Sequence, residues 1–258
     1  MVKPTRKHPV KRNRTAQRSM RIFYLALLVI AVVGIGALTY VSNRPKAEIT
    51  LSPIDTTLPK VESNGYAMGS PSAPVEVIEF GDFECPACGQ FATITEPDVR
   101  SRLVDQGKIR FRFIDFPLSM HQNTWNASRA AACADEQGKF WPMHDAIFAT
   151  QDRWNTEATR NPDKFLKHLA DSLGLNTLQF DACVDSKKYQ AKIQAHERMA
   201  IARNVQATPT FVFGDEALSG PLPYDEFKQQ VDALLARSGS PLASGGADSS
   251  AGKRAPRR

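Results

Sequence analysis

The chain has 258 residues, of which 42% are hydrophobic, enough to bury the core of one large domain or two small ones. Its formal net charge is +6, but residues 1–47 hold ten Lys or Arg and no acid, whereas residues 48–236 hold 18 Lys or Arg against 26 acids. The body of the protein is therefore acidic. A surface that binds phosphates needs positive charge on the folded part, so we expect no nucleic-acid partner.

Residues 22–41 form an apolar run without a charged side chain. A helix of this length spans roughly 30 Å, which matches a bilayer core. Eight Lys or Arg residues precede it in residues 1–21, so the positive-inside rule predicts a cytoplasmic basic segment, one transmembrane helix and an extracytoplasmic remainder. A cleaved signal peptide is the main alternative, although its apolar part is shorter, about 7 to 15 residues, and no good Ala-x-Ala site follows Gly36. A buried core helix is a weaker alternative.

Two stretches of low complexity delimit the folded domain. Residues 42–63 carry three prolines among polar residues and predict an extended tether. Residues 237–258 are rich in Ser, Gly and Ala and predict a disordered tail. We expect one domain between them, at residues 64–236.

The first part of this domain predicts a strand-helix-strand unit. An apolar run at 75–80 is followed by a helical pattern at 90–106, which Gly107 ends, and by a second strand pattern at 108–113. Two strands joined by a helix favour a parallel pair within an α/β fold.

A helical insertion interrupts this α/β pattern at about 117–204. Its candidate helices lie at 127–136, 140–150, 163–173, 178–185 and 189–203. Strand character then returns at 210–213, with 217–219 as a possible partner across the turn at Gly214, and 224–236 predicts a closing amphipathic helix.

All four cysteines follow the apolar run, which places them where disulfides persist if the predicted topology holds. Cys85 and Cys88 form a C-x-x-C pair, a pattern typical of half a zinc site, a structural staple or a redox centre. Zinc would need a second close ligand pair, but Cys133 and Cys183 stand far apart, so we expect no metal. Cys85 instead opens a helix behind a strand, where a thiolate is favoured.

The remainder of that turn fits a dithiol site. Pro86 falls at the first helical position, where proline is tolerated. Cys88 lies one turn further on the same face, so it can resolve a mixed disulfide formed at Cys85. We therefore interpret Cys85 as the attacking thiol and Cys88 as the resolving thiol.

Several motifs in order make the segment from 64 to 236 resemble the DsbA-type proteins, and in particular their BdbD-like branch. They are Gly-Ser-Pro-Ser-Ala-Pro-Val at 69–75, Glu-Phe-Gly-Asp-Phe-Glu-Cys-Pro-Ala-Cys at 79–88, Gln-Gly-Lys-Phe-Trp at 137–141 and Ala-Thr-Pro-Thr-Phe at 207–211. The resemblance implies a thioredoxin fold with an inserted all-helical domain and a thiol-disulfide oxidoreductase activity that needs no cofactor.

The resemblance also implies a substrate-binding site beside the dithiol. Pro209 would be a cis proline against the active-site disulfide, and Thr208 would offer its backbone to an extended substrate, next to Pro86 and Ala87. From the residues alone, Thr208-Pro209 before a strand indicates only a tight turn, because about 95% of X-Pro bonds in folded proteins are trans.

Glu79 is an acid in an otherwise apolar strand, six residues before Cys85. Thioredoxin-like proteins keep a buried carboxylate near the inner sulfur at this place, so the resemblance implies a proton acceptor for Cys88. A buried acid has a raised pKa and suits that role. The alternative is a solvated carboxylate at a sheet edge, like Glu76.

Ala87 departs from the DsbA pattern, which has His before the second cysteine. Since Ala87 donates no hydrogen bond, a lowered pKa of Cys85 would have to come from backbone N–H groups and the helix start, while Asp82 and Glu84 would oppose it. We hypothesise a milder oxidant than the most oxidising members of the family.

The resemblance implies a structural disulfide between Cys133 and Cys183 in the helical insertion. Two buried free thiols or a second redox relay remain as alternatives. The five histidines show no i, i+4 pair beside a carboxylate, so we expect surface or packing roles for them: His8, His121, His144, His168 and His196.

The sequence thus predicts a single-pass cell-membrane protein that donates its Cys85-Cys88 disulfide to thiol-containing, unfolded secreted proteins. The resemblance implies reoxidation by a quinone-linked membrane partner of the DsbB or vitamin K epoxide reductase type. Two alternatives remain: a reductase or isomerase fed by a membrane electron carrier, and a redox-inert chaperone or binding module.

Overall fold

The computed structural model describes residues 14–42, 51–53 and 65–239 and divides the chain into two units, 1–48 and 49–258. The predicted tail beyond 239 and the first thirteen residues of the predicted basic segment lie outside the described residues. In the first unit, helix α1 spans Arg14–Ser42 and contains the apolar stretch Phe23–Tyr40. By length and composition this helix could cross a membrane, and it begins eight residues before the span predicted from 22.

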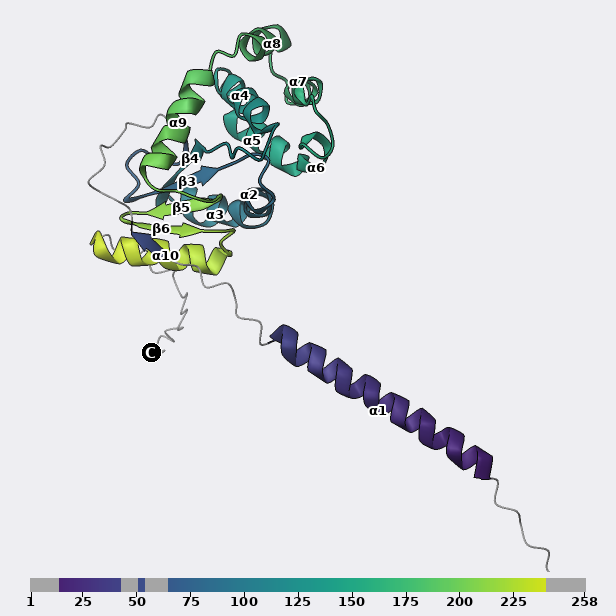
Figure 1. Cartoon of the computed structure of the whole chain (residues 1–258). Helices are drawn as coiled ribbons and strands as arrows, with labels where there is room; N and C mark the ends of the chain where they lie inside the picture. Colours follow the sequence, from purple (N-terminus) through teal and green to yellow (C-terminus); the bar gives the residue numbers. More distant parts are fainter. Residues whose placement is uncertain (1–13, 43–50, 54–64, 240–258) are drawn as a thin grey trace, which may run out of the picture. The chain divides into compact units, whose positions relative to one another are not determined.

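The second unit is built on a six-stranded mixed sheet with the order β1-β6-β5-β3-β4-β2 (Figure 1). Its central strands β3 and β4 run parallel, and every other pair is antiparallel. The strands are β1 Leu51–Pro53, β2 Tyr66–Met68, β3 Val75–Gly81, β4 Ile109–Asp115, β5 Thr210–Phe213 and β6 Glu216–Ser219.

Strand β1 lies within the segment 42–63 that the sequence predicts to be an extended tether, whose residues 43–50 and 54–63 lie outside the described residues. Its extended backbone pairs with the outer edge of β6 in the antiparallel register Leu51↔Leu218. Pro53 lacks a backbone N–H and is tolerated in an edge strand of this kind. The remaining described tether residue, Ser42, ends α1.

A broken helical run follows β3 and packs beside the sheet. It comprises α2 Pro86–Gln90, the π-helical turn η1 Phe91–Thr95, α3 Glu96–Val99 and a second π-helical turn, η2 Arg100–Val104. Gly107, with φ of +67°, allows the chain to reverse before β4. The predicted helix at 90–106 is therefore present, but it begins earlier, and its π turns leave no simple period in the sequence.

The insertion between β4 and β5 is helical, as the resemblance implied, and Figure 1 shows most of it gathered on one side of the strands. Its helices are α4 Thr124–Asp135, α5 Phe140–Ala149, α6 Gln151–Trp154, α7 Asp163–Ser172, α8 Thr177–Asp185 and α9 Gln190–Ala202. Helix α10, Tyr224–Arg237, closes the domain one residue beyond the predicted boundary at 236.

Three groups of buried apolar side chains hold these layers together. On one face of the sheet, Phe227 of α10 packs against Phe91 and Phe211. On the other face, residues of α9 pack against Phe80 and Ile114. A third group forms the core of the insertion and reaches Phe83 in the turn after β3. This third core lies directly against the turn that carries the C-x-x-C pair.

The insertion is cross-linked by a disulfide between Cys133 of α4 and Cys183 of α8, which stand 50 residues apart. Both cysteines are buried, with exposed fractions of 1% and 6%. The cross-link fastens α8 to α4, which supplies many residues of the insertion's core.

Replacing both Cys133 and Cys183 with Ser should lower the free energy of unfolding by about 2 to 4 kcal/mol, because a closed loop of this length restricts the unfolded chain. Urea denaturation of the variant and the parent, both with Cys85 and Cys88 reduced, measures the difference. Equal midpoints and slopes would contradict a stabilising disulfide.

Candidate active site

The C-x-x-C pair begins the helix that follows β3. Cys85 is the N-cap of α2 with extended backbone angles, and Pro86 occupies the first turn. The backbone N–H of Cys85 donates to the carbonyl oxygen of Asp82 at 3.0 Å, which closes the intervening turn. Both cysteines are free thiols; Cys85 is 7% exposed and Cys88 fully buried. Cys85 is therefore the less deeply buried of the two thiols.

The loop before β5 lies against this dithiol, although it is 123 residues away in the chain. The thiol of Cys85 donates to the carbonyl oxygen of Thr208 at 3.3 Å. The bond between Thr208 and Pro209 is cis. Pro86 is exposed and Ala87 half-buried between the cysteines. The structure therefore brings Cys85, Cys88, Pro86, Ala87 and the Thr208-Pro209 loop together.

The pKa of Cys85 is lowered to about 6. The main cause is a hydrogen bond from the side chain of Cys88, which stabilises the thiolate, whereas burial opposes the shift. A side-chain hydrogen bond with Thr208 and the backbone N–H groups of Cys88 and Ala87 lower it further. Above pH 6 Cys85 is therefore mostly thiolate, the form that attacks disulfides.

Cys88 shows the opposite shift. Burial raises its pKa well above the ordinary value, and the neighbouring Cys85 and Glu79 add to the rise. The backbone N–H of Asp82 donates to its sulfur at 3.5 Å and partly offsets the effect. Cys88 therefore stays protonated at neutral pH, and it needs a base before it can attack.

Glu79 is a buried carboxyl in the middle of β3, with 1% of its surface exposed. Burial raises its pKa well above the ordinary value, and the negative charges of Glu96 and Cys85 raise it further. Glu76, by contrast, is exposed and pairs with Arg112 at 2.6 Å. Glu79 is thus buried, whereas Glu76 of the same strand is exposed and ion-paired.

Asp82 and Glu84, predicted to oppose the Cys85 thiolate, lie in the turn between β3 and Cys85, and the main causes of the lowered pKa of Cys85 lie elsewhere. Both are buried because their carboxylates hold the insertion onto the active-site turn. Asp82 accepts from the backbone N–H of Leu118 at 2.8 Å and contacts His121 Nδ1 at 2.8 Å. Glu84 accepts from the backbone N–H of Asn123 at 2.8 Å and from that of Thr156.

Sequence reasoning missed two residues of the insertion at this turn. His121 contacts Asp82, and that hydrogen bond raises the pKa of the imidazole. Gln151 donates from Nε2 to the carbonyl oxygens of Phe83 and Cys85, at 2.8 and 3.0 Å. Neither residue has a signal in its spacing, because each contact joins segments far apart in the chain.

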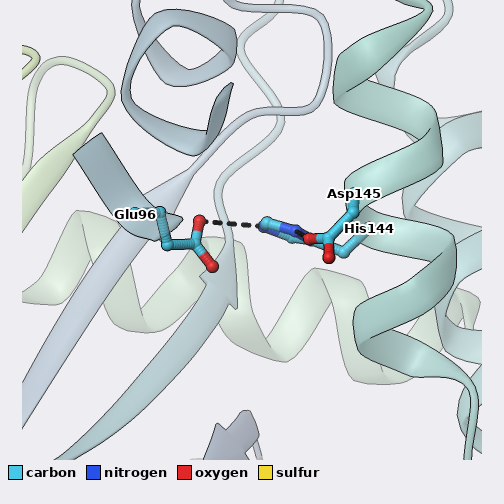
Figure 2. Close-up of side chains that lie close together, drawn as sticks. All are labelled: Glu96, His144 and Asp145. Atoms are coloured by element: carbon cyan, nitrogen blue, oxygen red, sulfur yellow. Dashed lines mark hydrogen bonds and ion pairs between the residues drawn. The ribbon is translucent and has the colours of Figure 1, made fainter. Parts of the chain in front are cut away.

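One group among the described residues has the ligand types of a metal site: Glu96, His144 and Asp145, shown in Figure 2. A cation already pairs with both carboxylates, because Arg100 Nη2 lies 2.5 Å from Glu96 Oε1 and 2.5 Å from Asp145 Oδ1. A metal ion would have to bind beside this guanidinium charge, which is unfavourable.

A sequence model of the thioredoxin family matches residues 62–233, about two thirds of the chain. The chain belongs to the thioredoxin family. Within it, the protein resembles the DsbA-like and BdbD-like thiol-disulfide oxidoreductases in sequence and in fold. Thiol-disulfide exchange at a C-x-x-C pair is a chemistry of these oxidoreductases, and the turn at Cys85 holds such a pair.

Three relatives define this relationship. Disulfide bond formation protein D of Bacillus subtilis is 29% identical over 177 residues, covering 65% of this chain and 76% of the relative. The crystal structure of oxidised BdbD from Bacillus subtilis superimposes with a TM-score of 0.60 at 25% identity, over 67% of this chain and 93% of that one. The α-DsbA1 of Wolbachia pipientis, at 24% identity over 70% and 94% of the two chains, shares the fold with a TM-score of 0.61.

A different relative is a longer protein. The Na(+)/H(+) antiporter NhaA 3 of Salinispora tropica is 33% identical over 192 residues, which cover 71% of this chain and 26% of the antiporter. The chain therefore spans only about a quarter of that relative's length.

The lowered pKa of Cys85 can be tested by replacing Cys88 with Ala. This change removes the hydrogen bond that contributes most to the shift, so the thiolate absorbance of Cys85 should titrate at a higher pH than in the parent, whose midpoint should lie near 6. An unchanged midpoint in the variant, or a strongly acidic midpoint in the parent, would contradict this account.

Replacing Glu79 with Gln tests the buried carboxyl as a proton acceptor. The amide keeps the shape but accepts no proton at neutral pH, so the attack of Cys88 on a mixed disulfide at Cys85 should slow by about 100-fold or more. Rapid-mixing kinetics measure that step, with Glu76→Gln as the matched exposed control. A rate equal to that of the parent would remove the proposed role.

Proposed function

We propose that this protein is a membrane-anchored, extracytoplasmic oxidase that donates its Cys85-Cys88 disulfide to unfolded secreted proteins with free thiols. The observation that carries the proposal is the pairing of one thiol of low pKa, Cys85, with a more deeply buried thiol of raised pKa, Cys88. A low pKa stabilises the reduced enzyme as a thiolate, and a dithiol that is stable when reduced gives up its disulfide readily.

The exchange follows from this geometry. A substrate thiolate attacks Cys85 Sγ, the bond between Cys85 and Cys88 breaks, and Cys88 leaves as a thiolate that takes a proton from Glu79. A second substrate thiolate then attacks the substrate sulfur of the mixed disulfide, and Cys85 leaves as a thiolate. The substrate loses two electrons as its disulfide forms, and the enzyme gains them. The carbonyl oxygen of Thr208 beside Cys85 supports docking of an extended substrate along the Pro209 loop.

The proposed location rests on α1. Residues 22–41 would form the single membrane span, residues 1–21 would stay in the cytoplasm and the domain at 64–236 would lie outside, because the basic residues precede the span. A quinone-linked membrane protein of the DsbB or vitamin K epoxide reductase type would reoxidise Cys85 and Cys88. Anchoring in the same membrane would raise the effective concentration of the two partners.

The oxidised protein should form disulfides in a reduced, unfolded model substrate, and Cys85→Ser should abolish this activity, with the exposed His168→Gln as a control. Equilibration with glutathione should give a reduction potential above that of thioredoxin, about −270 mV, yet below that of the most oxidising members, about −120 mV. A potential at or below that of thioredoxin would favour the reductase alternative. Activity that survives in Cys85→Ser would contradict the dithiol mechanism and leave the binding-module alternative.

A further inference from the structure

Three buried polar atoms near the dithiol have no protein hydrogen-bond partner among the described residues. They are Glu79 Oε2, Glu96 Oε2 and His144 Nε2. Their side chains are at most 1% exposed, and buried polar atoms are nearly always hydrogen-bonded. All three belong to titratable groups, which can gain or lose a proton.

Packing over Gly81 links Glu79 to this group. A Cβ atom at Gly81 would lie 2.4 Å from the ring of Phe113 and 3.2 Å from Glu79 Oε1, so the ring and the carboxyl meet above this glycine. His144 is one of several rings that pack against Phe113, at 5.2 Å between ring centroids with the planes nearly perpendicular. The ring of Phe113 thus lies close to both Glu79 and His144, and Glu79 is near enough to Glu96 for the charge of Glu96 to raise the pKa of Glu79.

His144 continues from there to the surface. Its Nε2 points to Glu96 Oε2 at 3.9 Å, and its Nδ1 lies 2.9 Å from Asp145 Oδ1, as Figure 2 shows. The side chain of Asp145 is 48% exposed, whereas those of Glu96 and His144 are buried. An imidazole that hydrogen-bonds on one side and faces a carboxylate on the other can accept a proton at one nitrogen and release one at the other.

Arg100 holds the two carboxylates in place on either side of this imidazole. Its guanidinium donates to Glu96 Oε1 through Nε at 2.8 Å and to Asp145 Oδ2 through Nη1 at 2.8 Å. These bonds occupy the outer oxygen of Glu96 and leave Oε2 directed at His144. Aromatic rings surround the imidazole and keep bulk water away from Nε2, among them Phe83, Phe113 and Phe148.

We propose that Glu96 and His144 form a proton relay between Glu79 and solvent at Asp145. The proposal rests on the dithiol function of Cys85 and Cys88 and adds the route by which the proton of Cys88 enters and leaves. Glu96 and His144 act through Glu79 and do not contact the sulfurs.

The relay carries a proton outward when the reduced protein is reoxidised. During reoxidation the thiolate of Cys85 attacks the partner's disulfide and forms a mixed disulfide. Glu79 takes the proton of Cys88, whose thiolate bonds to Cys85 as the partner's sulfur leaves with the electron pair. The proton passes from Glu79 to Glu96 and to His144 Nε2, while the proton on Nδ1 passes to Asp145 and water.

Substrate oxidation drives the same relay inward, because the Cys88 thiolate released in that step needs a proton. One proton therefore enters and one leaves in each full cycle. The outward step changes the tautomer of the His144 imidazole and the inward step restores it, so the ring does not have to rotate. This suits a ring that is packed on all sides.

The test uses the reduced full-length protein in detergent and the symmetric disulfide of nitrothiobenzoate, which releases a coloured thiolate. The first phase reports attack by Cys85, and the second reports attack by Cys88 on the mixed disulfide. A missing first phase would show that the proposed function itself fails. Glu96→Gln keeps the size of the buried side chain, Asp145→Asn changes only the exposed end, and His168→Gln is the control for loss of a histidine elsewhere.

We expect a normal first phase in Glu96→Gln and Asp145→Asn and a second phase slowed by about tenfold, less than the loss expected for Glu79→Gln. Added imidazole buffer should restore the second phase in Glu96→Gln, with a rate that follows buffer concentration and pH, because a small base can replace a lost relay but not a lost fold. The parent should show no such dependence.

A second phase of parental rate in both variants would overturn the relay and leave the dithiol function intact. The relay would also be overturned if both phases were slower in the variants and imidazole buffer did not restore the second one. That result would indicate a disturbed active-site turn.

Discussion

The active site depends on the antiparallel pairing of β3 with β5 at the centre of the sheet. The register Phe80↔Thr210 sets the end of β3 beside the start of β5, so the turn at Cys85 and the loop at Thr208 meet at one edge. A slip of one residue would turn Glu79 to the opposite face of the sheet and move its carboxyl away from Cys88. The dithiol, the buried carboxyl of Glu79 and the loop at Thr208 therefore share one structural cause.

The helical insertion acts on this edge through hydrogen bonds rather than through apolar packing alone. Asp82 and Glu84 accept from backbone N–H groups of the insertion, and Gln151 donates to backbone carbonyls of the turn. Each of these polar groups is buried or partly buried, and losing a partner would cost about 1 to 3 kcal/mol. This exchange of donors and acceptors holds the Cys85 turn in place against the insertion.

The sequence predicted those parts of the fold that leave a local pattern. The strands at 75–80 and 210–213, the main helices of the insertion and the buried position of Glu79 all followed from apolar spacing or from motif order. The short strands β1 and β2 did not, because three residues are too few to show alternation. The contacts of His121, His144 and Gln151 arise only when distant segments pack, so no spacing could reveal them.

The two cysteine pairs of this chain differ in covalent state although all four side chains are buried. Cys133 and Cys183 are joined in a disulfide inside the insertion, whereas Cys85 and Cys88 are free thiols, with Cys85 beside the Thr208 loop. Under the proposed function the second pair forms and breaks its disulfide at every turnover, while the first stays closed. The disulfide between Cys133 and Cys183 is itself a product of thiol oxidation, the class of reaction that the protein is proposed to perform on others.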